Sequence, residues 1–263
     1  MAIHPTRRRF LGWGTAALAG LAVSALSMPS LLKTASASPA GSAASPLATA
    51  TASASATPGS APTAATVTIP VPVIQQQMVL DCETAALQQA LAYFGHTVSQ
   101  AELFAQEYAD TRLPVMGAGH TVLNWGNPYT QFVGYVNGSD YAPTGYGVYW
   151  PVILKLARAY GVPNAVGGEG FSPATIYAEL AAGNPVQVWI ETRFARAWTG
   201  TWTAWDGTPV RYSYAEHSVT LSGVSPTQVR VNDVLDGSQY WVSKALFEAN
   251  FADFNNMAVI FKP

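Results

Sequence analysis

The order of secondary-structure patterns constrains the fold of this chain more than any other feature. Apolar residues recur at helical spacing from Asp81 to Gly95, and further helices are predicted at 99–110, 151–160 and 173–182. Segments rich in β-branched residues come later, at 186–191, 217–224, 228–234, 239–242 and 257–261, with one more helix near 244–251. Helices followed by a run of strands predict an α+β fold, with the helices packed on an antiparallel sheet.

Three connecting segments also carry predictions. Residues 67–74 contain β-branched residues and two prolines, which indicates an extended edge segment. Residues 112–147 are rich in glycine, asparagine and aromatic residues, and we expect a long irregular loop of functional importance there. Residues 198–210 carry tryptophans around Asp206-Gly207, which predicts a hairpin or flap.

The N-terminus predicts export. The stretch from Thr6 to Gly12, TRRRFLG, matches the twin-arginine export signal of bacteria, and an uncharged stretch follows it to Leu32. Ala35-Ser36-Ala37 offers a small-residue cleavage site, so we interpret residues 1–37 as a signal peptide recognised by the twin-arginine export machinery. The expected location is extracellular or at the cell surface, with no stable membrane partner after cleavage. An uncleaved membrane anchor is the alternative.

Residues 38–66 are almost entirely alanine, serine, threonine, proline and glycine, which predicts a disordered linker. Residues 67–263 then form one domain. Of the 13 basic residues of the chain, four lie in the signal, at Arg7, Arg8, Arg9 and Lys33, which leaves nine against 15 acidic residues. An acidic domain without a basic patch is not expected to bind nucleic acid.

Cys82 is the only cysteine of the chain, and the helical pattern places it at the first helical position behind the N-cap Asp81. A helix N-terminus carries partial positive charge, and we expect it to lower the pKa of the thiol. A nucleophilic cysteine also needs a base and a group that orients the base.

His217 and Asp233 are the candidates for these two roles. His217 begins one predicted strand and Asp233 lies near the end of the next, and these two places fall at the same end of a hairpin. Cys82, His217 and Asp233 thus have the chain order of a Cys-His-Asp triad. Gln76 lies six residues before Cys82, and its amide is a candidate donor to the oxyanion, although Gln75 and Gln77 flank it.

Each of these residues also has a simpler interpretation. A lone cysteine is commonly a small buried apolar residue, and Asn232-Asp233 is ordinary turn chemistry. The three glutamines are equally acceptable as solvated polar residues. The combination of all these groups, in this order and in an exported chain, favours a catalytic site.

Several segments resemble the papain-like cysteine peptidases related to bacteriocin leader peptidases, which cleave after a double glycine, in their exported stand-alone branch (peptidase C39-like). They are VPVIQQ (71–76), DCETAAL (81–87), GNPYTQFVG (126–134), YGVYWPVILKLARAYG (146–161), LAAGNPVQVWI (180–190) and HSVTLSGVSPTQVRVNDVLDG (217–237). The resemblance implies a papain-like fold and a cysteine peptidase, a hydrolase acting on a peptide or protein substrate. It implies Cys82 as nucleophile, His217 as base, Asp233 as orienting group and Gln76 as oxyanion donor. Leader peptidases carry Cys-Gly where this chain has Cys82-Glu83.

Two other functions remain open. An NlpC-type cell-wall peptidase also uses an exported papain-like fold, but its histidine follows the cysteine much sooner. A catalytically silent module that binds peptide or cell wall through the aromatic residues of 112–147 is the second alternative. The chain has no C-x-x-C, H-E-x-x-H or G-x-S-x-G motif and no phosphate-binding glycine loop, so no metal and no organic cofactor is expected.

Overall fold

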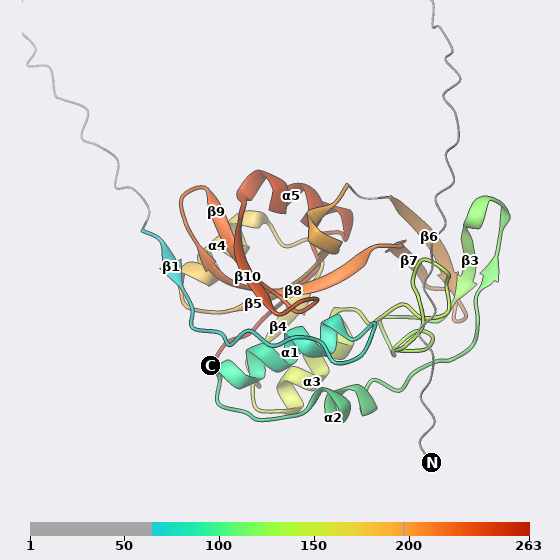
Figure 1. Cartoon of the computed structure of the whole chain (residues 1–263), viewed down its shortest axis with the longest axis horizontal. Helices are drawn as coiled ribbons and strands as arrows, with labels where there is room; N and C mark the ends of the chain where they lie inside the picture. The colour runs from blue at the N-terminus through green and yellow to red at the C-terminus, as the bar shows by residue number, and fades with distance from the viewer. Residues whose placement is uncertain (1–64, 197) are drawn as a thin grey trace, which may run out of the picture. The chain divides into compact units, whose positions relative to one another are not determined.

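An antiparallel sheet is the centre of the computed structural model, which describes residues 65–196 and 198–263 (Figure 1). Within these residues the sheet has seven strands in the order β10-β9-β8-β5-β11-β4, with the short β1 paired to β8. The strands are β1 Val67–Thr68, β4 Val166–Gly168, β5 Val186–Glu191, β8 Glu216–Val224, β9 Gln228–Asp233, β10 Ser238–Ser243 and β11 Ala258–Ile260. The predicted α+β class is confirmed.

Helices cover both faces of this sheet. Figure 1 shows α1 and α3 on one face and α4 and α5 on the other. The helices are α1 Cys82–Tyr93, α2 Gln100–Ala105, α3 Trp150–Ala159, α4 Pro173–Ala181 and α5 Lys244–Asp253. Strand β5 shows why both faces need a cover: Trp189 packs in the core with α1 and α3, whereas Val188 and Ile190 pack in the core with α4 and α5. A sheet buried on both faces gives strands that are apolar almost throughout.

A second, smaller sheet corrects the prediction of an irregular segment at 112–147. Its four strands lie in the order β2-β3-β6-β7, and they are β2 Val115–Met116, β3 Val122–Trp125, β6 Thr199–Ala204 and β7 Pro209–Ser213. Trp125 of β3 and Trp202 of β6 lie 5.6 Å apart between ring centroids. Strands β2 and β3 pair as a local hairpin, whereas β3 also pairs in parallel with the distant β6, a contact that a local pattern does not show.

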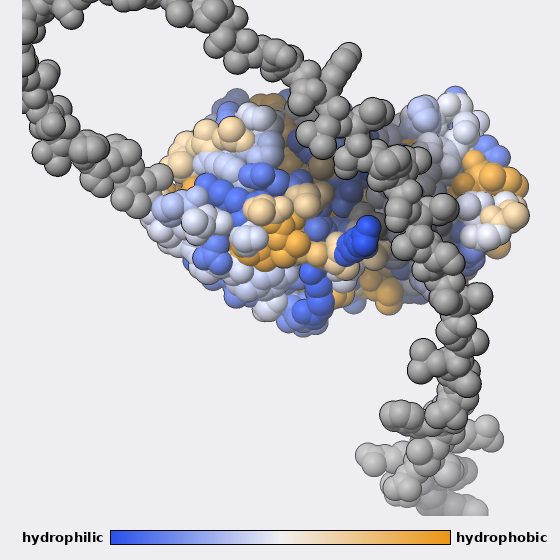
Figure 2. Space-filling view, turned by 90° about the horizontal axis from the view of Figure 1, so that it is seen from above, coloured by the Kyte–Doolittle hydropathy of each residue, from blue (hydrophilic) through white to orange (hydrophobic). Residues whose placement is uncertain are grey.

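The smaller sheet also carries exposed apolar residues. Val115, Met116 and Leu123 of β2 and β3 are all exposed. Figure 2 shows apolar side chains at the end of the molecule where Figure 1 draws the hairpin that contains β3. In residues 65–196 and 198–263, no helix combines the length and the apolar character that crossing a membrane requires.

Most predicted boundaries agree with the structure to within one or two residues. Helix α1 begins at Cys82, and Gly95 follows its end with a positive φ of 85°. The helix predicted at 99–110 is shorter, since α2 ends at Ala105, although Ser99 caps it as expected by accepting from the Glu102 amide. Only β1 of the predicted extended segment 67–74 pairs as a strand. The predicted signal 1–37, and all of the linker 38–66 except its last two residues, lie outside the described residues.

Candidate active site

Cys82 is the first residue of α1, at the position that the sequence predicts. Its backbone amide belongs to the first turn, where helix amides have no acceptor within the helix. Asp81 occupies the N-cap position, but its side chain does not cap the helix. Asp81 Oδ1 instead accepts from the Met78 amide at 3.1 Å, which ties the preceding loop to the helix start. Cys82 is buried, with 6% of its surface exposed.

The hairpin of β8 and β9 brings His217 and Asp233 together. His217 Nε2 lies 2.8 Å from Asp233 Oδ1, and both side chains are buried. The Leu235 amide also donates to Oδ1 at 3.0 Å, and the Tyr240 hydroxyl donates to Oδ2 at 2.7 Å. Burial opposes the charge of this carboxylate, but the hydrogen bonds from His217 and Tyr240 outweigh it and lower the pKa of Asp233 to about 2. Asp233 is therefore ionised at neutral pH.

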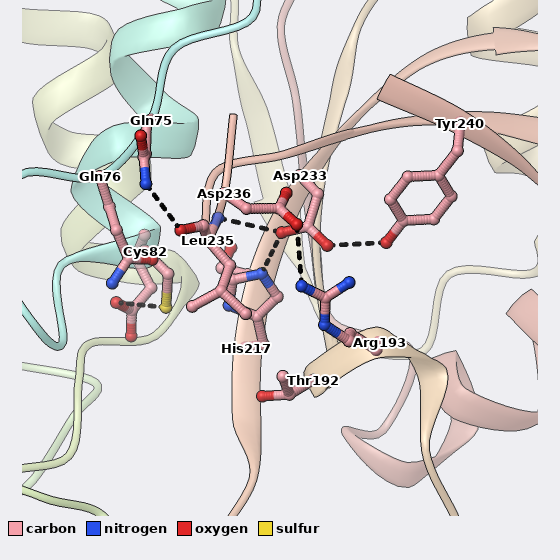
Figure 3. Close-up of polar contacts among 12 residues, drawn as sticks. Gln75, Gln76, Cys82, Thr192, Arg193, His217, Asp233, Leu235, Asp236 and Tyr240 are labelled. Atoms are coloured by element: carbon pink, nitrogen blue, oxygen red, sulfur yellow. Dashed lines mark hydrogen bonds and ion pairs between the residues drawn. The ribbon is translucent and has the colours of Figure 1, made fainter. Parts of the chain in front are cut away.

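The partner of Nε2 decides which nitrogen of His217 faces the thiol. An ionised carboxylate only accepts hydrogen bonds, so Nε2 carries a proton, and in the neutral imidazole Nδ1 is then the nitrogen with the lone pair. Figure 3 shows the imidazole of His217 between Cys82 and Asp233. This is the geometry of a base held by an orienting carboxylate.

A resting thiolate–imidazolium pair needs a hydrogen bond between Cys82 and His217, but the thiol of Cys82 bonds Glu83 instead. Cys82 Sγ donates to Glu83 Oε2 at 3.3 Å, and no hydrogen bond joins Sγ to His217 within the described residues. Glu83 is 1% exposed, and its other oxygen, Oε1, accepts from the Val148 amide at 2.8 Å. Gly147 makes room for this carboxylate, because a Cβ there would lie 2.0 Å from Glu83 Oε1.

The expected lowering of the thiol pKa is wrong. Burial, followed by the negative charges of Glu83 and Glu216, raises the pKa of Cys82 well above its usual value. Burial also raises the pKa of Glu83 to about 7. The partial charge of one helix terminus is a small effect, and desolvation together with two neighbouring acids exceeds it.

A cavity of about 230 Å³ opens beside Cys82. It is lined by Gln76, Val79, Leu80, Cys82, Asp140, Tyr146, Thr192, Glu216, His217 and Leu235. A larger hollow of about 530 Å³ between Phe194 and α5 contains none of the predicted site residues. The structure thus brings the predicted nucleophile, base and glutamine to one cavity, with Asp233 behind the base.

The three glutamines before Cys82 differ in exposure. Gln76 is half-buried and lines the cavity, whereas Gln75 and Gln77 are exposed. Gln76 Nε2 donates to the carbonyls of Met78 and Val79, at 3.0 and 2.8 Å. Both amide hydrogens are therefore engaged, and one must be released before Gln76 can donate to an oxyanion.

One cluster in the described part of the chain has donors suited to a metal ion. Cys82 Sγ and a carboxylate oxygen from each of Glu83 and Glu216 lie within 4.8 Å of one another. Thiolate and carboxylate are ligands that Zn²⁺ accepts. Burial raises the pKa of all three groups and so favours their protonated forms.

Sequence reasoning missed Glu83 and Glu216 as parts of the site. Their positions gave a signal, since Glu83 follows Cys82 and Glu216 precedes His217. Neighbours along a strand normally face opposite sides of a sheet, so alternation from His217 does not point to Glu216. Glu216 and His217 nevertheless both line the cavity, at the start of β8.

Comparison with known proteins identifies the family. The model of the Peptidase_C39 like family matches residues 68–259. The uncharacterized protein YvpB of Bacillus subtilis is 29% identical over 181 residues, which cover 68% of each chain. A crystal structure assigned as a C39-like peptidase from Bacillus anthracis superposes with a TM-score of 0.65 at 29% identity, over 76% of this chain and 98% of that one. The fold is therefore that of the papain-like cysteine peptidases, as the resemblance implied, and the chain belongs to the peptidase C39-like family.

Proposed function

We propose that this protein is an exported cysteine peptidase in which Cys82 attacks a peptide bond, His217 transfers the proton and Asp233 orients His217. The observation that carries the proposal is the buried His217–Asp233 hydrogen bond of 2.8 Å, with His217 lining the same cavity as Cys82. Membership of the peptidase C39-like family supports this function over an NlpC-type cell-wall peptidase.

The chemistry follows from the proton positions. The thiol turns from Glu83 toward His217 and gives its proton to Nδ1, and the thiolate then attacks the substrate carbonyl. The resulting oxyanion lies near the free amide of Cys82 and the side chain of Gln76. His217 returns the proton to the leaving amine, and water then attacks the acyl-enzyme, with His217 again as base. Asp233, ionised throughout, stabilises the imidazolium in both steps.

Hydrolysis of a fluorogenic peptide pool by the purified protein tests this function. Cys82→Ala should abolish both hydrolysis and labelling by a thiol-reactive probe, because the chain has no other cysteine. His217→Ala should lose nearly as much activity, and Asp233→Ala less, because Asp233 acts through His217. Full activity of Cys82→Ala would refute the assignment. Wild-type protein that is labelled at Cys82 but cleaves nothing would favour a silent binding module.

Export by the twin-arginine machinery is part of the same proposal. It is supported by the TRRRFLG stretch at 6–12. Replacing both Arg7 and Arg8 by Lys should retain the protein inside the cell, and Arg9→Lys is the matched control that leaves the paired arginines in place. Unchanged export of the double variant would contradict this route.

A further inference from the structure

Glu216 is a buried acid that the proposed chemistry does not use. It begins β8 next to His217, is 8% exposed and lines the cavity beside Cys82. Its Oε1 atom is buried and has no hydrogen-bond partner among the described residues. A buried carboxylate oxygen without a partner is uncommon in folded proteins and calls for an explanation.

No cation of the protein neutralises this acid. The ion pairs in residues 65–196 and 198–263 leave Glu216 out, and the cavity lining contains neither lysine nor arginine. The charged groups that face Glu216 are acids on three other elements, namely Glu83 of α1, Asp140 of the loop before α3 and Glu191 of β5. His217 beside it is committed to Asp233.

The geometry suits a positively charged ligand. A carboxylate oxygen of Glu216 lies within 4.8 Å of Cys82 Sγ, so a group bound to Glu216 would lie next to the reacting atom. Asp140 lines the same cavity and is only partly buried, so it can extend the acidic lining toward solvent. A cation that enters this lining gains charge-assisted hydrogen bonds to groups that otherwise have no counter-charge.

We propose that Glu216, together with Asp140, forms a subsite for a cationic group of the substrate, a lysine or arginine side chain or a free amine, directly beside Cys82. The inference rests on the proposed function only in assigning this cation to a peptide substrate. The bound cation pairs with the Glu216 carboxylate and places its positive charge next to Cys82 Sγ, which favours the thiolate. Substrate binding therefore activates the nucleophile.

Three small thiol reagents of different charge test the subsite without any peptidase activity. They are the methanethiosulfonates with an aminoethyl (cationic), an ethyl (neutral) and a sulfonatoethyl (anionic) group. In each case the Cys82 thiolate attacks the sulfenyl sulfur, a disulfide forms, methanesulfinate leaves with the bonding electron pair and the thiol proton passes to the buffer. Intact mass measures the rate for the whole chain, whose one cysteine makes the product unambiguous. A chelator removes any metal from the Cys82 cluster, and each rate is divided by that of free cysteine.

We expect the normalised rate of the cationic reagent to exceed that of the neutral one by about tenfold to a hundredfold, the range of a hydrogen bond to a charged group, with the anionic reagent slowest. Glu216→Gln should bring the ratio close to one, and Asp140→Asn should lower it in part. Glu248→Gln is the matched control: it removes an acid that bonds Tyr177 away from the cavity, and should leave the ratio unchanged.

Equal normalised rates in the wild type, a ratio that survives both Glu216→Gln and Asp140→Asn, or no reaction with any reagent would each overturn the inference. If Glu216→Gln loses its native circular dichroism, the rate ratio of Asp140→Asn tests the subsite in its place. This variant should fold, because Asp140 is only partly buried and asparagine keeps the oxygen that accepts from the Tyr141 amide. Peptides with lysine or norleucine near the scissile bond then test the link to catalysis. A charge preference in labelling without any peptide hydrolysis would remove the proposed function and keep the subsite.

Discussion

The hydrogen bond between Cys82 and Glu83 leads to a direct prediction about the reactivity of the thiol. The acid accepts from Sγ at 3.3 Å and from the Val148 amide at 2.8 Å, inside a fully buried site. Glu83→Gln keeps the shape and the oxygen that faces Val148. It replaces Oε2, which favours the protonated thiol, by an amide nitrogen that donates to the thiolate.

The size of the effect follows from this exchange of partners. A hydrogen bond to a charged group contributes about 1.5–3 kcal/mol, which corresponds to about one to two pKa units. We therefore expect Glu83→Gln to lower the pKa of Cys82 by about one to two units, although burial still holds it high. A thiolate of lower pKa is also a weaker nucleophile, so the labelling rate at neutral pH should rise by only about threefold to tenfold.

The assay is the pH dependence of alkylation of Cys82 by iodoacetamide, a small uncharged reagent. Glu102→Gln is the matched control, because Glu102 is an exposed acid on α2 away from the cavity. The alkylation midpoint of Glu83→Gln could instead stay in place or move to higher pH while the native circular dichroism is retained. That result would refute the assignment of Glu83 as the acceptor that stabilises the protonated thiol.

Three further predictions concern the same region. Gln76→Ala should lower turnover by about a hundredfold to a thousandfold, the usual cost of losing an oxyanion donor, with little change in Cys82 labelling. Gln75→Ala and Gln77→Ala should lower turnover far less. If Gln75 or Gln77 proves the sensitive residue instead, the donor lies one residue away. Burial raises the pKa of Glu83 from 4.5 to about 7, so the folded state holds a proton that the unfolded chain releases. This proton therefore contributes to the free energy of unfolding in full below the unfolded pKa, and the contribution is lost as the pH rises through about 7. Urea unfolding measures it, and the free energy of unfolding of Glu83→Gln should depend less on pH. Gly147→Ala should destabilise the fold by about 1–3 kcal/mol in thermal unfolding, because the new Cβ collides with Glu83. Gly168→Ala should cost much less, because its Cβ meets Phe171 at an ordinary 3.4 Å. Equal losses of stability in the two variants would contradict the packing of Glu83.

The local sequence determined where the elements begin and which residues lie at the same end of a tight hairpin. The helix start at Cys82 follows from an apolar repeat behind Asp81, and both signals act within one or two turns of the chain. The approach of His217 to Asp233 follows from two strands joined by a three-residue connection, because such a hairpin brings the start of one strand to the same end as the finish of the next.

The tertiary structure decided what surrounds the thiol. The Glu83 carboxylate is held by the Val148 amide, 65 residues along the chain, in space that Gly147 leaves open. Glu216 joins it from β8, and burial of all three groups reverses the pKa shift that the helix terminus alone would give to Cys82. The same holds for the place of β3 in the smaller sheet, because β3 pairs in parallel with β6, which comes from a distant part of the chain. Desolvation depends on every atom packed around a group, and these atoms come from segments far apart in the chain, so a pattern read within a few residues does not contain it.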